Sequence, residues 1–357
     1  MILLSKNFFI LCSFFLFGFL TVLKGQDDFF EPGTTIGGYG ELHFNKSKNE
    51  IGNIKNTLDF HRFVLFVSHG FSEKWSFKSE VELEHNIVEE NQGALELEQA
   101  YIDYHFSNYL GFQAGVVLPS VGILNELHEP PTFFGVERPE YHKYIIPTTW
   151  FGNGLAVYGN YHDFDYKITV MEGLNSDKFS FSSGIRSGRQ EGFKSNADNL
   201  LYNLRVNYLG FQNILFGSSF TYNKAKGDST EIPVFLIEAH FQANFNDLIL
   251  RGEAGNINYS TGTLKSSFGY YFDLGYDLSR LFKIDWSIVP FFRFTEYNAS
   301  ERVRNTLNVS NGVTKWMFGL TVKPLNEIVL KFDYAERNMK KETGTEKLFN
   351  LGVGYMF

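Results

Sequence analysis

The sequence has 357 residues, which is long enough for two ordinary soluble domains or for one large β-barrel. Aromatic residues make up 17% of the chain, with 39 Phe and 19 Tyr, and the formal net charge at pH 7 is -8. Such a chain lacks the basic footprint that nucleic acid requires, which excludes a nucleic-acid partner. The single cysteine, Cys12, gives no basis for a disulfide framework or a thiolate metal site.

The first 25 residues have the pattern of a secretory signal peptide. Lys6 supplies a positive charge, an apolar run extends from Phe8 to Leu23, and Gly25-Gln26 offers a cleavage point. A membrane anchor fits less well, because an apolar run of about 16 residues is shorter than the roughly 20 of a spanning helix. We therefore expect residues 1–25 to be cleaved on export, 26–35 to form a periplasmic segment and 36–357 to form the folded domain.

Beyond residue 35, apolar and polar residues alternate with a period of two, which is typical of strands with two different faces. In the last segment, Leu351 and Val353 fall on one face, and Asn350 and Gly352 on the other. We count about sixteen such segments, at 36–45, 57–68, 73–85, 96–106, 111–118, 152–161, 164–173, 198–208, 211–223, 232–245, 247–258, 265–278, 282–296, 314–323, 327–338 and 346–357. Most reach the roughly 9 to 11 residues of a tilted transmembrane strand, whereas soluble strands average 5 to 6.

The connections between these segments alternate in length. The short ones are 72–74, 108–110, 163–165, 209–210, 246–247, 279–281 and 324–326. The long ones are 46–56, 87–95, 119–151, 174–197, 224–231, 259–264, 297–313 and 339–345. Short periplasmic turns and long external loops are typical of outer-membrane barrels, and an even strand number lets the first and last strands pair. The sequence thus predicts an all-β, antiparallel transmembrane barrel of about sixteen strands in the outer membrane of a diderm bacterium.

Membrane lipid is the first partner that this prediction implies, because one face of each strand is apolar. The chain ends at Phe357, in a strand whose apolar residues are spaced by two. A C-terminal strand of this kind suits recognition by the barrel-assembly machinery.

Two parts of the chain resemble the phosphate-selective porin O and P family. The first is 75–82, and the second comprises 97–104, 111–115, the bend between Pro119 and Gly122, and 134–139. The resemblance is specific over about residues 57–140 and architectural beyond them. It implies a 16-stranded porin, often a trimer, whose third external loop folds inward and narrows the pore. In this chain that loop is 119–151, and its five prolines favour an ordered constriction.

The polar faces of the predicted strands give the expected pore lining. Its main candidates are Glu41, His43, Lys78, Glu80, Glu82, Glu84, Asp103, His105, Arg251 and Glu253. Over all strands, the acidic candidates Glu41, Glu80, Glu82, Glu84, Asp103, Glu238, Glu253, Asp273, Asp285 and Asp333 outnumber the basic candidates Lys78, Lys167, Arg205, Arg251, Arg293 and Lys331. Carboxylate rings favour cations. The expected wall therefore departs from the basic lining on which anion selectivity in the family rests.

The predicted constriction loop carries its own charged cluster, formed by Glu137, Arg138, Glu140, His142 and Lys143. Opposed charges of this kind could orient and filter a passing solute. The same residues could instead form ion pairs that hold the loop against the wall, and the two interpretations are compatible.

Enzymatic and metal-dependent functions find little support in the sequence. The nine histidines show no compact ligand spacing, and no Gly-x-Ser-x-Gly elbow is present, so we predict no metal site, no cofactor and no catalytic residues. The favoured function is passive diffusion of small hydrophilic solutes. The alternatives are a non-conducting barrel, such as an adhesin or an assembly protein, which ion conductance would distinguish, and a barrel hydrolase.

Overall fold

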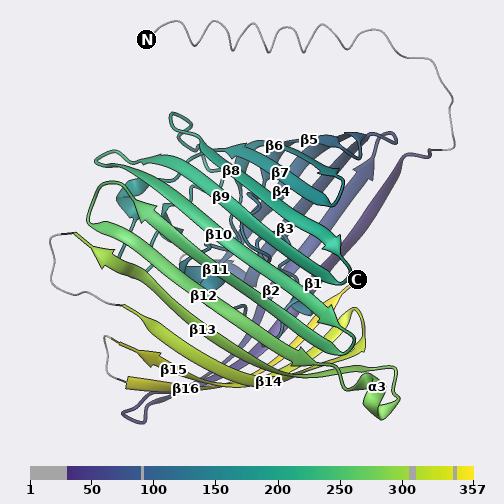
Figure 1. Cartoon of the computed structure of the whole chain (residues 1–357), viewed down its shortest axis with the longest axis vertical. Helices are drawn as coiled ribbons and strands as arrows, with labels where there is room; N and C mark the ends of the chain where they lie inside the picture. Colours follow the sequence, from purple (N-terminus) through teal and green to yellow (C-terminus); the bar gives the residue numbers. More distant parts are fainter. Residues whose placement is uncertain (1–29, 90–91, 305–310, 341–343) are drawn as a thin grey trace, which may run out of the picture. The chain divides into compact units, whose positions relative to one another are not determined.

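The computed structural model describes residues 30–89, 92–304, 311–340 and 344–357. Each strand is antiparallel to its neighbours in the chain, and β1 also pairs with β16, so the sheet closes into a barrel (Figure 1). The strands are β1 (Gly33–Lys48), β2 (Ile54–Gly70), β3 (Trp75–Glu89), β4 (Gln92–Ser107), β5 (Leu110–Val117), β6 (Gly152–Tyr161), β7 (Phe164–Met171), β8 (Leu201–Phe211), β9 (Ile214–Lys226), β10 (Glu231–Phe245), β11 (Leu248–Tyr259), β12 (Leu264–Tyr276), β13 (Ser287–Val303), β14 (Val313–Leu325), β15 (Ile328–Met339) and β16 (Gly344–Met356). The predicted fold class and the sixteen strands are confirmed.

The chain divides into two units, Met1–Pro32 and Gly33–Phe357, and the second is the barrel. Its first strand begins at Gly33, slightly before the predicted start of the folded domain at residue 36. The predicted signal peptide, with Cys12, lies outside the described residues. Within the described ranges, no helix is both long enough and apolar enough to cross a bilayer.

Burial along the strands is the reverse of the pattern in a soluble protein. On β10, Phe235 and Ile237 are 41% and 39% exposed, whereas the alternating Glu238 and His240 are 1% and 6% exposed. The polar side chains therefore face the lumen, and the apolar side chains form the outer surface. An outward apolar band of this kind is what lipid contact requires.

Exposed aromatic side chains gather at the barrel end that carries the short connections. They are Phe71, Trp75, Phe106, Tyr109, Tyr161, Phe164, Phe211, Phe216, Phe245, Tyr276, Trp286 and Phe357. Trp and Tyr are enriched where a membrane meets water, because their rings are apolar and carry one polar group. This belt marks one edge of the membrane-facing surface.

The connection lengths differ from the predicted ones in places. The predicted turn at 209–210 lies within β8, and the chain instead turns at 212–213, where Asn213 has a φ of +62°, a conformation that Asn tolerates. The predicted short turn 279–281 is the helix α3 (Ser279–Phe282), within a longer connection. Several predicted loops are shorter because the strands continue further, as at β1 and β2, which leave only residues 49–53 between them.

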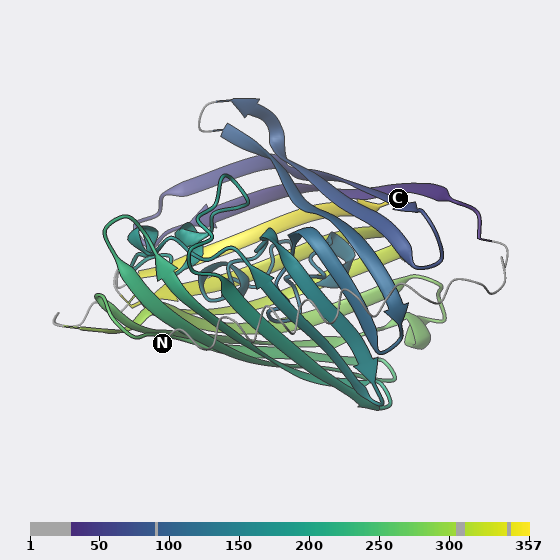
Figure 2. The ribbon, with the colours of Figure 1, turned by 90° about the horizontal axis from the view of Figure 1, so that it is seen from above.

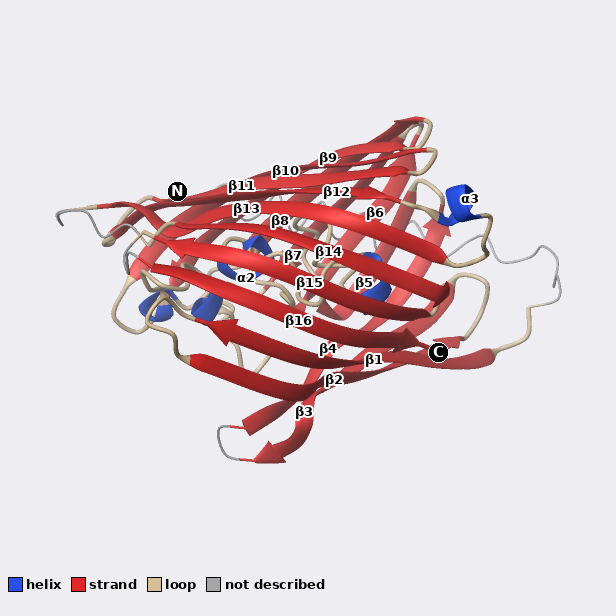
Figure 3. Cartoon of the chain, turned by 90° about the horizontal axis from the view of Figure 1, so that it is seen from below, coloured by secondary structure: helices blue, strands red, loops and turns tan. Residues whose placement is uncertain are grey.

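Two long segments connect strands at the opposite end of the barrel. Segment 118–151 joins β5 to β6 and contains η1 (Pro130–Thr132) and α2 (Tyr141–Tyr144), and segment 172–200 joins β7 to β8 and contains η2 (Ser176–Lys178) and η3 (Arg186–Gly188). Figures 2 and 3 show short helical and irregular segments inside the ring of strands, with α2 among them, whereas α3 lies outside the ring. The lumen is therefore occupied by chain.

Candidate functional site in the barrel lumen

Segment 118–151 is held in the lumen by hydrogen bonds from its backbone to side chains on distant strands. Three amides donate to the wall: Ser120 to Asn203 Oδ1 on β8 at 3.0 Å, Ile123 to Glu253 Oε2 on β11 at 3.0 Å, and Val136 to Asp333 Oδ2 on β15 at 2.7 Å. A loop inside a barrel has to pair its amides, because an unpaired buried amide costs about as much as a lost hydrogen bond. The inward polar side chains of the strands supply these partners.

Apolar contacts fix the same segment on its other side. Tyr141, Ile145, Ile146 and Trp150 are at most 1% exposed and belong to one buried cluster with inward residues of the wall, among them Tyr271. Tyr144 stacks on Tyr297 of β13, with ring centroids 4.5 Å apart. The segment thus shares a hydrophobic core with the barrel wall inside the lumen.

Ion pairs tie the segment to opposite sides of the wall. Glu126 lies 2.8 Å from Lys167 Nζ on β7 and also pairs with Arg205 on β8. Burial opposes ionisation of Glu126, but these two cations outweigh it and lower the pKa of the carboxyl to about 2. Glu140 lies 3.2 Å from Lys315 Nζ on β14 and 3.3 Å from Arg337 Nη1 on β15.

His142 and Glu137 of the loop contact β11 and β1. The Nε2 of His142 donates to Glu253 Oε1 at 2.7 Å, and Tyr271 OH donates to the same oxygen at 2.6 Å. Glu137 Oε1 lies 3.0 Å from His43 Nδ1 and accepts from Asn45 Nδ2 at 3.1 Å, so it contacts β1.

The predicted acidic stripe of the first strands is largely neutralised by partners. Arg62 on β2 forms ion pairs with Glu41 at 2.8 Å and with Glu82 at 3.5 Å. His128, from the loop, lies 3.2 Å from Glu80 and 3.3 Å from Glu98. All four carboxylates are buried. They form an ion-pair network and not an open row of negative charge.

Among the described residues, the loop borders a larger and a smaller cavity. The larger, about 440 Å³, lies at the long-connection end, where its wall includes His43, His61 and Arg62 of β1 and β2 and its floor includes Glu137 and His142. The smaller, about 290 Å³, lies nearer the short-turn end and is lined by residues 122–127 together with inward residues of β8 to β10. Glu253 contacts His142 at the first cavity and Ile123 at the second, so its hydrogen bonds lie between the two.

Comparison with known proteins identifies this architecture. Residues 37–213 match the family described as phosphate-selective porin O and P. A protein of Aquifex aeolicus (strain VF5) is 30% identical over 355 residues, which cover 92% of this chain and 80% of that protein. The chain belongs to the phosphate-selective porin O and P family. The porin is an outer-membrane channel, and its family and fold indicate a channel and not an enzyme.

Solved porins share the fold at low sequence identity. An anion-selective porin from Comamonas acidovorans has a TM-score of 0.64 at 11% identity and covers 92% of this chain and 100% of its own. Salmonella typhi OmpF, in a complex with daunomycin, has a TM-score of 0.64 at 13% identity, with 91% and 97% covered. The outer-membrane channel DcaP of Acinetobacter baumannii has a TM-score of 0.59 at 10% identity, with 95% and 100% covered.

The porin does not bring all the predicted site residues to one place. Asp103 accepts from Tyr158 OH at 3.0 Å, and Lys78 and His105 lie exposed near the short-turn end. Arg251 donates to the backbone oxygen of Thr132 at 2.8 Å.

Of three further predicted residues, two line the larger cavity and one lies outside the lumen. Glu84 and Lys143 both border it. Asp285 was expected in the lumen but lies exposed in the connection between β12 and β13, because the strand that we expected from residue 282 begins only at Ser287.

Two β-bulges explain which lumen residues strand periodicity misses. Glu41 pairs with Arg62 and Leu42 with Phe60, so His61 is the extra residue on β2. Glu80 pairs with Gln99 and Val81 with Leu97, so Glu98 is the extra residue on β4. A bulge lets two consecutive residues face the same side. A prediction from strict alternation therefore places one of the two consecutive residues at each bulge on the lipid-facing side, although both face the lumen.

Proposed function

We propose that this porin is a passive diffusion channel for small hydrophilic solutes, with segment 119–151 as its constriction. The supporting observation is the ring of contacts that hold this segment to β1, β8, β11, β14 and β15 inside the lumen. Because the backbone amides, the apolar cluster and the ion pairs all anchor it, the segment narrows the lumen in a fixed position. Solutes pass between it and the wall, by way of the two cavities.

The larger cavity favours anions under this proposal. Its lining holds eight Lys and Arg residues, Lys46, Lys55, Arg62, Arg138, Lys143, Arg186, Lys315 and Arg337, against four Glu residues, Glu41, Glu84, Glu137 and Glu140. In the described part of the chain, Nε and Nη2 of Arg138 are buried without a hydrogen-bond partner. Basic groups that line a pore favour anions. The excess of basic residues around this cavity therefore supports an anion preference, whereas the strand faces alone led us to expect a cation preference.

The experiment that tests the channel is planar-bilayer recording of the purified protein across a salt gradient. We expect stepwise openings with a reversal potential on the anion-preferring side. A cation-preferring reversal potential would reject the role of the basic cavity. Complete absence of steps from correctly folded protein would reject the channel and favour a non-conducting adhesin or assembly barrel.

Export and assembly belong to the same proposal. Residues 1–25 act as a cleaved signal peptide, and the residues between it and the start of β1 at Gly33 act as a periplasmic segment that leads into the barrel. The long connections lie outside the cell. The barrel-assembly machinery recognises the strand that ends at Phe357, and the apolar outer surface contacts membrane lipid. A homotrimer is the proposed assembly, because a solved neighbour of similar fold, OmpT of Vibrio cholerae, is described in a trimer form.

A further inference from the structure

Histidines from three neighbouring strands lie close together, and two of them, His43 and His61, line the larger cavity. The rings of His43 on β1 and His61 on β2 stack with centroids 4.8 Å apart, and the centroid of His85, on β3, lies 5.7 Å from that of His61. These histidines are separated by more residues along the chain than the ligands of short metal-binding motifs. The pairing of β1 with β2 and of β2 with β3 brings them together. The sequence-based expectation of no metal site rested on spacing, which does not capture this juxtaposition.

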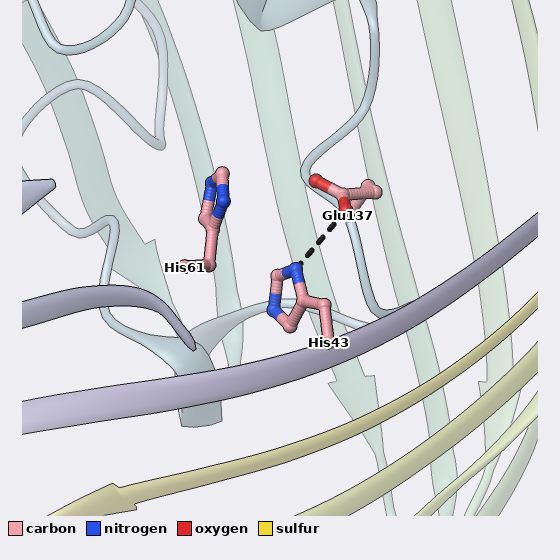
Figure 4. Close-up of side chains that lie close together, drawn as sticks. All are labelled: His43, His61 and Glu137. Atoms are coloured by element: carbon pink, nitrogen blue, oxygen red, sulfur yellow. Dashed lines mark hydrogen bonds and ion pairs between the residues drawn. The ribbon is translucent and has the colours of Figure 1, made fainter. Parts of the chain in front are cut away.

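Glu137 completes the group from the loop. Its carboxylate, the His43 ring and the His61 ring lie around a common space (Figure 4), and one ligand atom from each of the three residues lies within 4.8 Å of the others. We propose that His43, His61 and Glu137 form a binding site for a divalent transition-metal ion of the Zn²⁺ class. Two imidazoles and one carboxylate suit Zn²⁺, Cu²⁺ or Ni²⁺, and the hard cations Mg²⁺ and Ca²⁺ prefer all-oxygen sites.

Neighbouring carboxylates hold both imidazoles as they are held in metal sites. His43 presents Nδ1 to Glu137, while its Nε2 lies 3.1 Å from Glu41. His61 presents its Nδ1 to Asp59 at 3.2 Å, which leaves Nε2 for a ligand. Histidines that bind metals almost always give their other ring nitrogen to a carboxylate or carbonyl, which fixes the ring and raises its basicity. Here both histidines have such a partner, on the two strands that form the site.

The third ligand and its access also fit. Asn45 Nδ2 donates to Glu137 Oε1 at 3.1 Å and so orients the carboxylate. All three ligands border the cavity of about 440 Å³, which gives an ion a route from the long-connection end. In a tetrahedral site with bonds of about 2.0–2.1 Å, ligand atoms lie about 3.4 Å apart, so the side chains need to move by roughly 1 Å or slightly more.

Isothermal titration of the full-length, detergent-purified porin with ZnCl₂ tests the site directly, and MgCl₂ serves as the hard-cation comparison. We expect one Zn²⁺ per chain and no Mg²⁺ binding. His61→Asn and Glu137→Gln should each weaken Zn²⁺ binding by at least about tenfold, because even the loss of an outer-shell partner costs 10- to 100-fold. Because the titration measures only metal binding, its result does not depend on whether the porin conducts.

Two matched histidine variants distinguish this site from its neighbours. His162→Asn replaces an exposed histidine in the β6–β7 turn, where a φ of +52° suits Asn, and should bind Zn²⁺ as the wild type does. His85→Asn removes a ligand of the adjacent group of Asp59, His61 and His85 and should also leave binding unchanged. Loss of binding in His85→Asn with retention in Glu137→Gln would overturn the assignment, as would a wild type that does not bind Zn²⁺. Glu137→Gln changes only the loop, so it keeps the test valid if a strand variant fails to fold.

Discussion

The imidazole of His142 in the loop donates a 2.7 Å hydrogen bond to Glu253 on β11, and both side chains are fully buried. Glu253 also accepts from Tyr271 OH and from the backbone amide of Ile123. One carboxylate of the wall therefore holds two parts of the loop, at positions nearly twenty residues apart in the chain.

Glu253→Gln is expected to loosen the proposed constriction. The amide keeps the size of the side chain but removes the negative charge, and a hydrogen bond to a charged group contributes about 1.5–3 kcal/mol. Single-channel recording should show higher open-channel noise and a larger mean conductance than the wild type. Asp285→Asn makes the same change on an exposed connection and should leave both quantities unchanged. Equal recordings from the two variants would argue against this anchor.

Gly122→Ala is expected to disturb the same anchor from the loop side. Gly122 has a φ of +68°, where a side chain costs about 1–2 kcal/mol, and an added Cβ would collide with the Glu253 carboxylate. Gly52→Ala is the matched control, because its φ is +88° but open space surrounds the added Cβ. Both variants carry backbone strain, but only Gly122→Ala should change the conductance. A conductance change in Gly52→Ala of the same size would show that strain alone explains the effect.

The strands could be predicted from the sequence because lipid and water impose opposite demands on their two faces. On β16, Leu351 and Val353 are exposed while Asn350, Gly352 and Gly354 are buried, as the alternation predicts. Turn positions were less predictable, since residues beyond the membrane are wet on both faces and lose the period of two. For this reason the sequence pattern predicts the β8–β9 turn at 209–210, whereas the structure has it at 212–213.

The charged cluster of the loop could be located from the sequence, but its partners could not. Glu140 needs Lys315 and Arg337, which are more than 170 residues away and meet it only because the barrel closes. The bulges at His61 and Glu98 are invisible to periodicity. The histidine group depends on one of these bulges and on the register of β1 with β2, so no spacing rule along the chain could find it.

Alkaline pH is expected to weaken the contact between the loop and the first strands. Burial disfavours the charged form of His128, but hydrogen bonds to Glu80 and Glu98 outweigh this and raise the pKa of the imidazole to about 10, from an ordinary 6.5. A raised pKa in the folded state gives stability that is full below pH 6.5 and is lost as the pH rises towards 10. Conductance noise in the wild type should therefore increase between pH 7 and 10. His128→Gln cannot titrate, so its noise should not vary over this window, and a wild-type profile as flat as the variant's would contradict the role of His128.

Arg138→Gln is expected to reduce the anion preference of the larger cavity. Arg138 borders this cavity, so its positive charge contributes to the potential that a solute meets there. One unit charge at about 4 Å in water contributes about 1 kcal/mol, or about fivefold in the ratio of anion to cation permeability. The reversal potential in a salt gradient measures this ratio. Arg280→Gln removes an equal charge from α3, outside the lumen, where Arg280 is paired with Asp247 at 3.4 Å. A shift of the same size in both variants would mean that net charge sets the selectivity; a shift confined to Arg138→Gln would assign it to the cavity.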